Sequence, residues 1–119
     1  MLAPLLALSM YLPSSQATQD FGRGSALVRD CKSFIHVMDT TEPVETVELS
    51  NANYCMGYLD GLVSFMDKAT SRVCLPAHTS ATLARVYVLY MGTHPKLFDE
   101  EQKLGAYLAL LDAYPCPAK

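Results

Sequence analysis

Four cysteines constrain the fold of this chain more than any other feature of its sequence. Cys31, Cys55, Cys74 and Cys116 are an even set, separated by 24, 19 and 42 residues. None of these intervals is the C-x-x-C spacing of zinc or redox sites. The cysteines therefore predict two disulfides and no metal site, which indicates an oxidising compartment. Four cysteines allow three pairings, and the spacing alone does not choose among them.

The N-terminal segment is typical of an exported protein. Residues 1–12 are almost wholly apolar, and Ser15 and Ala17 stand at the −3 and −1 positions of a small-residue cleavage site. The apolar run is too short to span a bilayer as a helix, which needs about 20 residues. We therefore expect a signal peptide over residues 1–17 and one mature domain over residues 18–119. Because no basic residue precedes the run, an ordinary apolar strand or helix is the alternative.

Composition narrows the class of partner. Half of the residues are hydrophobic and 18% are charged, as in a globular protein. The net charge is −3, and no segment supplies a basic patch. The sequence therefore excludes the electrostatic footprint that nucleic acids or anionic membranes require.

Apolar residues recur at intervals of three and four in four segments, 27–38, 55–69, 83–90 and 104–114. This spacing places them on one face of a helix. Four such helices with short connections predict an all-α fold, a small antiparallel four-helix bundle. About 100 residues bury only a small core, so the two disulfides are expected to contribute much of the stability.

Turn and capping residues set the predicted helix boundaries. The polar run 39–43 ends the first helix at a proline. The second is expected to begin at Ser50 or Asn51 and the third at Thr79 or Ser80, which are all good N-cap residues. Residues 44–49 are ambiguous between strand and loop. Asp99, with Gln102 three residues later, resembles a capping box that opens the fourth helix.

Two glycines stand one turn apart in the second predicted helix. Gly57 and Gly61 each cost about 1 kcal/mol relative to alanine in a helix interior. We expect another helix to pack closely against them, and a tolerated bend is the alternative.

No catalytic or cofactor motif accompanies this pattern. The chain contains no nucleophile elbow, no H-E-x-x-H and no phosphate-binding loop. Asp60 and Asp67 lie two helical turns apart, but two carboxylates on a solvated helix face are far commoner than a catalytic pair. Cysteines held in disulfides supply no thiolate. We therefore assign no catalytic residue and no cofactor, and expect a binding protein rather than an enzyme.

Four short motifs follow one another along the predicted helices. They are C-M-G-Y-L-D-G at 55–61, C-L-P at 74–76, H-P at 94–95 and A-Y-P-C at 113–116. In this order and spacing, together with a cysteine in the first helix, they resemble the Rap/Tai family, the immunity proteins of type VI secretion amidase effectors. The resemblance covers essentially the whole mature chain.

This resemblance implies a periplasmic, all-helical and often dimeric protein. Such a protein binds a peptidoglycan-cleaving amidase and blocks its active site. The matching residues are scaffold residues, so the motifs themselves assign no contact with the toxin. A small helical periplasmic chaperone or stress-response binding protein is the alternative, and it predicts promiscuous binding through exposed apolar surface.

The bundle topology suggests where a partner would bind. If the helices alternate in direction, the loops over 39–48 and 92–99 project from the same end. Glu42, Glu45, His94 and Lys96 would then be polar groups able to reach into a cleft. Plain solvated loops are the alternative.

The same topology favours one disulfide pairing, Cys31–Cys55 and Cys74–Cys116. Two antiparallel helices joined by a loop bring Cys31 and Cys55 to similar heights. The end of the fourth helix returns to the start of the third, which brings Cys116 near Cys74. The other pairings would join opposite ends of the bundle, whereas bridged Cα atoms lie within about 7 Å.

Overall fold

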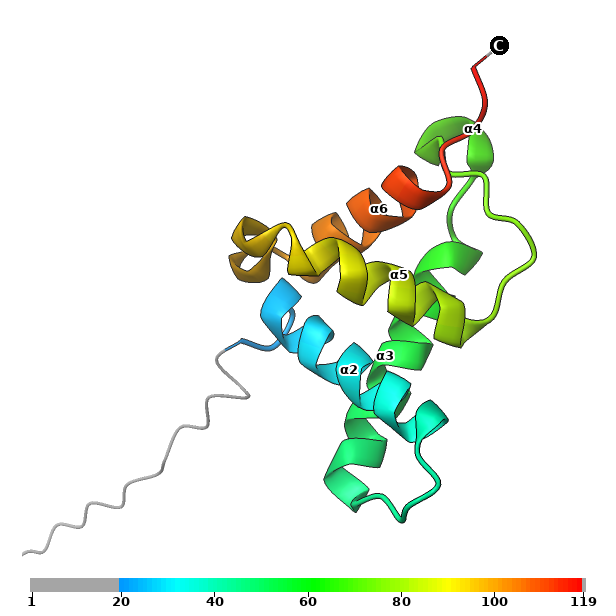
Figure 1. Cartoon of the computed structure of the whole chain (residues 1–119). Coiled ribbons are helices and arrows are strands. Elements are labelled where there is room, and N and C mark those ends of the chain that lie inside the picture. Colours follow the sequence, from blue (N-terminus) through cyan, green and yellow to red (C-terminus); the bar gives the residue numbers. More distant parts are fainter. Residues whose placement is uncertain (1–19, 119) are drawn as a thin grey trace, which may run out of the picture.

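A computed structural model describes residues 20–118, which form helices and connecting loops (Figure 1). The elements in chain order are α2 (Gly24–Asp39), α3 (Thr46–Ser64), α4 (Lys68–Ser71), α5 (Ser80–Gly92), the 3-10 helix η1 (Pro95–Asp99) and α6 (Gln102–Ala113). Within this part of the chain no strand forms, and only two isolated bridges pair extended residues, Arg23 with Glu101 and Val73 with Pro115. The predicted all-α fold is confirmed. The expected signal peptide, residues 1–17, lies outside the described residues.

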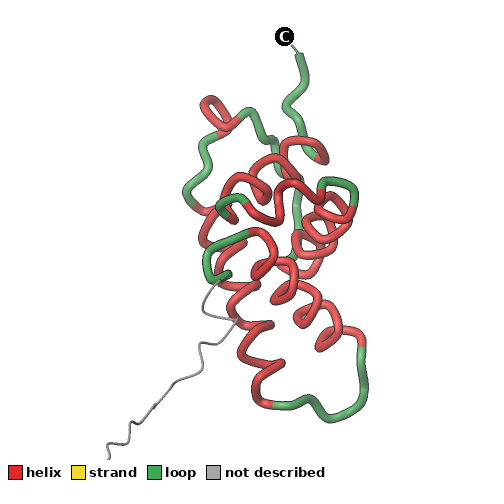
Figure 2. Tube along the Cα trace, turned by 90° about the vertical axis from the view of Figure 1, so that its left-hand side faces the viewer, coloured by secondary structure: helices red, strands yellow, loops and turns green. Residues whose placement is uncertain are grey.

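The four long helices pack around one core, and Figure 2 shows the path of these helices turned by 90° from the view of Figure 1. Helices α2 and α3 run in opposite directions, as two contacts show: Cys31 bonds to Cys55, and the later residue His36 pairs with the earlier residue Glu48. The largest fully buried apolar side chains come from all four helices: Leu27, Leu59, Leu83, Tyr87, Met91 and Leu110. The predicted apolar stripes of the first three helices supply Leu27, Leu59, Leu83 and Tyr87, as burial of one helix face requires.

The direction of α5 differs from that of a simple up-and-down bundle. The start of α5 lies beside the end of α2, where Arg85 pairs with Asp39 at 2.6 Å. Its end lies beside the start of α2, where the Tyr87 hydroxyl donates to the Gly24 carbonyl at 3.3 Å. The long connection between α3 and α5, which contains α4, allows this arrangement by carrying the chain back across the bundle (Figure 1).

Helix α3 begins four residues before the earlier of the two expected N-caps. Its first residue is Thr46, and the Leu49 N–H already donates to the Glu45 carbonyl at 3.0 Å. It ends at Ser64, so the expected continuation of its apolar stripe to Ala69 is wrong. A separate helix, α4, starts at Lys68. Asp67 caps it, because the Asp67 carboxylate accepts the Ala69 N–H at 3.1 Å and so satisfies a free amide of the first turn.

The predicted cap of the third helix is confirmed, and that of the fourth is wrong. The Thr79 hydroxyl accepts the Thr82 N–H at 3.2 Å at the start of α5. The residue expected to cap the fourth helix, Asp99, instead ends η1, and α6 begins at Gln102 without a side-chain cap. Pro95 explains the difference, because proline suits the first turn of a helix and opens a separate turn before α6.

The close helix contacts occur at different glycines from those expected. A Cβ on Gly57 or Gly61 would meet no atom within 4 Å, so the expected close packing there is wrong. A Cβ on Gly105 would lie 2.8 Å from the Met91 sulfur, and one on Gly24 would overlap the Leu97 carbonyl. The buried face of α6 consists of one polar residue, three small residues and one leucine: Gln102, Gly105, Ala106, Ala109 and Leu110. Large residues of the predicted stripe such as Leu104 are displaced to its edge, because α5 approaches α6 too closely to admit them.

Both predicted disulfides are present. Cys31–Cys55 joins α2 to α3 inside the core, with a Cα–Cα distance of 5.0 Å. Cys74–Cys116 joins the segment after α4 to the C-terminal tail at 4.8 Å. None of the helices over residues 20–118 combines the length and the apolar character needed to cross a bilayer.

Candidate partner-binding site

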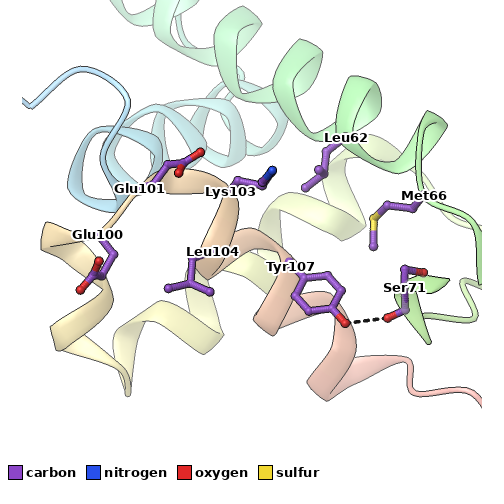
Figure 3. A pocket seen from close by; sticks show the side chains of 8 residues that line it. All are labelled: Leu62, Met66, Ser71, Glu100, Glu101, Lys103, Leu104 and Tyr107. Carbon is purple, nitrogen blue, oxygen red and sulfur yellow. Dashed lines mark hydrogen bonds between the residues drawn. The ribbon is translucent and has the colours of Figure 1, made fainter.

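A groove of about 500 Å³ opens between the end of α3, α4 and the start of α6 (Figure 3). Its lining side chains are Leu62, Met66, Ser71, Glu100, Glu101, Lys103, Leu104 and Tyr107. The Tyr107 hydroxyl donates to the Ser71 carbonyl at 2.7 Å and fixes one wall. The middle of the groove is apolar, and its charges stand at the end near η1. It can receive an apolar group, but its lining offers no imidazole or thiol for covalent chemistry.

A polar and aromatic cluster adjoins this groove. The Gln102 side-chain amide donates to the Tyr54 hydroxyl at 2.8 Å. The Tyr54 ring contacts Phe21 edge-on at 5.8 Å and stacks near Tyr58 at 6.1 Å. Burial, more than any nearby charge, raises the pKa of the Tyr58 phenol. The cluster ties α6 to α3 and serves the scaffold.

The two carboxylates weighed as a catalytic pair have structural partners. Asp60 accepts two short contacts from the Ser80 hydroxyl, at 2.7 and 2.8 Å, next to the start of α5. Asp67 caps α4. Each carboxylate therefore holds the start of a helix.

Asp30 is the carboxylate with the least contact with solvent. It is 6% exposed, and its Oδ1 lies 3.5 Å from the Arg29 Nε. Burial raises the pKa of Asp30, against the lowering effect of the Arg29 charge. Asp30 therefore bears on stability rather than on chemistry at the surface.

The structure separates the four residues that we expected to meet in one contact surface. Glu42 and Glu45 follow the end of α2, whereas the segment with His94 and Lys96 packs against its start (Figure 1). A helix of 16 residues is about 24 Å long. The two loops are therefore at opposite ends of α2, and the expectation that they share one end is wrong, because α5 runs antiparallel to α2.

His94 is occupied by local contacts. Its ring stacks on Tyr90 with centroids 3.8 Å apart, and its Nδ1 lies 2.7 Å from the Tyr90 carbonyl. This geometry fixes the end of α5. Lys96 is exposed on η1.

The loop between α2 and α3, with the helix ends that flank it, forms a second surface, which we name the hairpin tip and define as residues 38–49. Three apolar side chains are exposed here, Met38 at 56%, Val47 at 66% and Leu49 at 45%. Sequence reasoning missed all three, because it assigned Met38 to the core stripe and left residues 44–49 ambiguous. The sequence signal that could have revealed them is their place beside the loop over residues 40–45, because helix residues next to such a loop have no further helix to contact.

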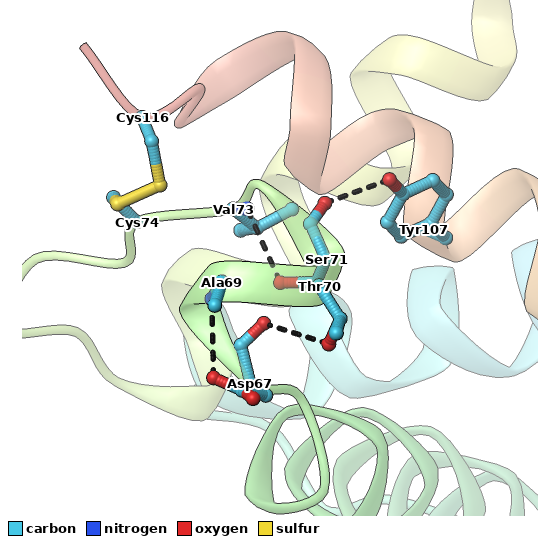
Figure 4. The surroundings of a disulfide bond; sticks show 8 residues. All are labelled: Asp67, Ala69, Thr70, Ser71, Val73, Cys74, Tyr107 and Cys116. Atoms are coloured by element: carbon cyan, nitrogen blue, oxygen red, sulfur yellow. Dashed lines mark hydrogen bonds between the residues drawn. A yellow bond between two sulfur atoms is a disulfide. The ribbon is translucent and has the colours of Figure 1, made fainter. Parts of the chain in front are cut away.

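The second disulfide, Cys74–Cys116, lies where the segment after α4 meets the C-terminal tail, and backbone hydrogen bonds hold the two segments together (Figure 4). The Cys74 N–H donates to the Tyr114 carbonyl at 2.8 Å, and the Cys116 N–H donates to the Arg72 carbonyl at 3.0 Å. The backbone thus holds the C-terminal tail on both sides of the bridge. Over residues 20–118 no group of three histidine, cysteine or carboxylate side chains is placed to hold a metal ion.

A family model described as Rap1a immunity proteins matches residues 23–116. The chain belongs to the Rap1a immunity protein family. The comparisons find no match to it among curated proteins or solved structures.

The match to the Rap1a family extends from the residue before α2 to the last cysteine. It includes both disulfides, all four long helices, the groove and the hairpin tip. The family consists of immunity proteins, which act by binding an effector. A surface that contacts a partner, rather than a catalytic centre, is therefore the relevant kind of site.

Proposed function

We propose that this Rap1a-family protein binds a peptidoglycan amidase effector of a type VI secretion system in the periplasm and inhibits it by covering its active site. The family match over residues 23–116 carries this proposal. The amidase as target and the blocked active site come from the motif resemblance, C-M-G-Y-L-D-G at 55–61 above all. The protein itself is proposed to have no catalytic activity.

Two features of the chain support the periplasmic location. The four cysteines form two disulfides, which persist in oxidising compartments. Residues 1–17 carry the apolar run and the Ser15-x-Ala17 pattern of a signal peptide. N-terminal sequencing of protein purified from the periplasm tests this part, and Thr18 as the first residue is the expected result.

The scaffold suits an inhibitor. A rigid surface loses little conformational entropy on binding, which favours affinity. Both disulfides and the backbone hydrogen bonds beside Cys74–Cys116 supply that rigidity. Protection of a cell wall requires a Kd on the order of nanomolar, about −12 kcal/mol.

Inhibition of peptidoglycan amidases encoded in the same genome, each purified and assayed separately, tests the proposal. The oxidised mature protein is titrated into each amidase, and release of muropeptides from cell-wall sacculi is measured. Loss of one amidase's activity at an equimolar ratio is expected, and cells that export that amidase should survive only when they also produce this protein. Cleavage of sacculi by the protein itself, or undiminished activity of every amidase at tenfold excess, contradicts the proposal. Light scattering on the mature protein tests the expected homodimer.

A further inference from the structure

The hairpin tip has the shape, apolar surface and charge of a plug. We infer that residues 38–49 enter the active-site cleft of the effector, and that this cleft carries cationic groups near its mouth. This inference rests on the proposed function and adds to it the surface that performs the inhibition.

The tip is an end of the molecule rather than part of its side. The loop over residues 40–45 joins α2 to α3 at the end of the molecule opposite the C-terminus (Figures 1 and 2). The Tyr87 hydroxyl of α5 bonds to the carbonyl of Gly24 at the start of α2, and the Arg85–Asp39 pair at 2.6 Å links α5 to the tip. The tip therefore protrudes far enough to enter a concave site.

The protrusion is held rigid by contacts across the hairpin. The buried Cys31–Cys55 bridge cross-links the two helices behind the tip. His36 pairs with Glu48 at 2.7 Å, and the Glu42 N–H donates to the Thr40 hydroxyl at 3.0 Å inside the loop. Little conformational freedom is then lost when the tip is enclosed.

Apolar side chains are exposed on more than one side of the tip. Val47 and Leu49 are two residues apart in α3, so they point about 200° apart around its axis. Glu48 lies between them and turns toward α2 through its pair with His36. A flat partner could cover only one of the two apolar side chains, whereas the walls of a cleft cover both.

The charge of the tip is unbalanced at its outermost residues. Asp39 is paired with Arg85, whose guanidinium holds the pKa of that carboxyl below its usual range, and Glu48 is paired with His36. Glu42 and Glu45 are exposed, and no basic side chain among residues 20–118 lies within ion-pairing distance of either one. Two unpaired carboxylates flanked by apolar side chains complement a cationic cleft mouth, which provides steering and specificity.

Two double variants test the surface by its apolar and charged parts. V47D/L49D replaces the apolar side chains, and E42K/E45K reverses the charge. Both pairs of positions are exposed, and acidic residues are favourable in the first turn of a helix. Glu45 makes no side-chain cap bond, so its replacement removes none. Leu89→Asp is the matched control, because Leu89 is 76% exposed on α5, away from the tip.

Each variant is titrated calorimetrically with the amidase that the inhibition assay identifies, its nucleophile replaced by alanine. Loss of a central apolar contact at an interface costs about 2 kcal/mol or more, so we expect the Kd of V47D/L49D to rise at least about 30-fold. E42K/E45K is expected to weaken binding at least about tenfold and to lose most of the salt dependence of the Kd. Leu89→Asp is expected to bind within threefold of wild type, and circular dichroism must show all three variants folded.

The outcomes separate this inference from the proposed function. If the wild-type protein binds the amidase but both tip variants bind equally well, the tip is not the contact surface and the proposed function stands. If Leu89→Asp alone loses binding, the contact surface includes α5 and the inference is overturned. If the wild-type protein does not bind, both proposals fail.

Discussion

Replacement of Gly24 by alanine is expected to destabilise the protein, although alanine is the better helix former. The added methyl group would overlap the Leu97 carbonyl and lie 2.9 Å from the Met91 Cε. Such overpacking costs about 1–3 kcal/mol. A shift of α2 to relieve it would weaken the Gly24 N–H bond to the Glu100 carbonyl at 2.9 Å and the Tyr87 bond to the Gly24 carbonyl. Alanine returns about 0.4–1 kcal/mol by restricting the unfolded chain, which leaves a net loss of about 1 kcal/mol.

Urea denaturation of the oxidised mature protein, followed by circular dichroism, measures this loss. A change of about 1 kcal/mol corresponds to a fall in Tm of about 5 °C for a domain of this size. Gly57→Ala is the matched control, because a Cβ there meets open space. This control should be about 0.5–1 kcal/mol more stable than wild type. If Gly24→Ala is as stable as Gly57→Ala, the close approach of η1 to α2 is refuted.

Three further changes test the burial and cross-links of the scaffold. Because burial raises the pKa of Asp30, the stability that this group confers is present below about pH 4 and is lost as pH rises through the raised pKa. In urea titrations, Asp30→Asn should therefore be more stable than wild type at pH 7 but not at pH 3. An equal advantage at both pH values contradicts this expectation. Tyr87→Phe removes the buried hydroxyl bond to Gly24 and should cost about 1 kcal/mol. Because burial also raises the pKa of Tyr87, that variant should lack the wild-type loss of stability above about pH 10. Joint replacement of Cys74 and Cys116 by serine opens a loop with a sequence separation of 42 and should lower the free energy of unfolding by about 4 kcal/mol. An unchanged urea midpoint would show that the backbone hydrogen bonds alone hold the C-terminal tail in place.

Much of the fold could be read from local sequence. The four apolar stripes predict the four long helices, and the even set of cysteines predicts two disulfides. Thr79 was identified as a cap because its hydroxyl needs only the backbone three residues ahead. The helices and the cap depend on contacts within one or two helical turns, which the sequence specifies directly, and the number of disulfides follows from the even count of cysteines.

The sequence predicted one contact surface from four residues, and the structure places them at two ends of α2. Glu42 and Glu45 lie on the protruding tip, but His94 and Lys96 are at the other end of α2. To predict whether these four residues share one end of the molecule, one must know the direction of α5 relative to α2. No residue pattern inside either helix encodes that direction. It follows from the long connection through α4 and from which helix faces fit together.

The sequence by itself determined that four long helices form and roughly where each one lies, how many disulfides form and which family the motifs resemble. Only the tertiary structure decided which glycines sit at close contacts, because Gly57 and Gly24 look alike in a sequence and differ in what lies opposite them. It likewise decided that Val47 and Leu49 are exposed, since an apolar residue at a helix start is buried only if another element reaches it. Helix formation depends on neighbours along the chain, whereas exposure depends on distant segments whose placement is set by packing of the whole core.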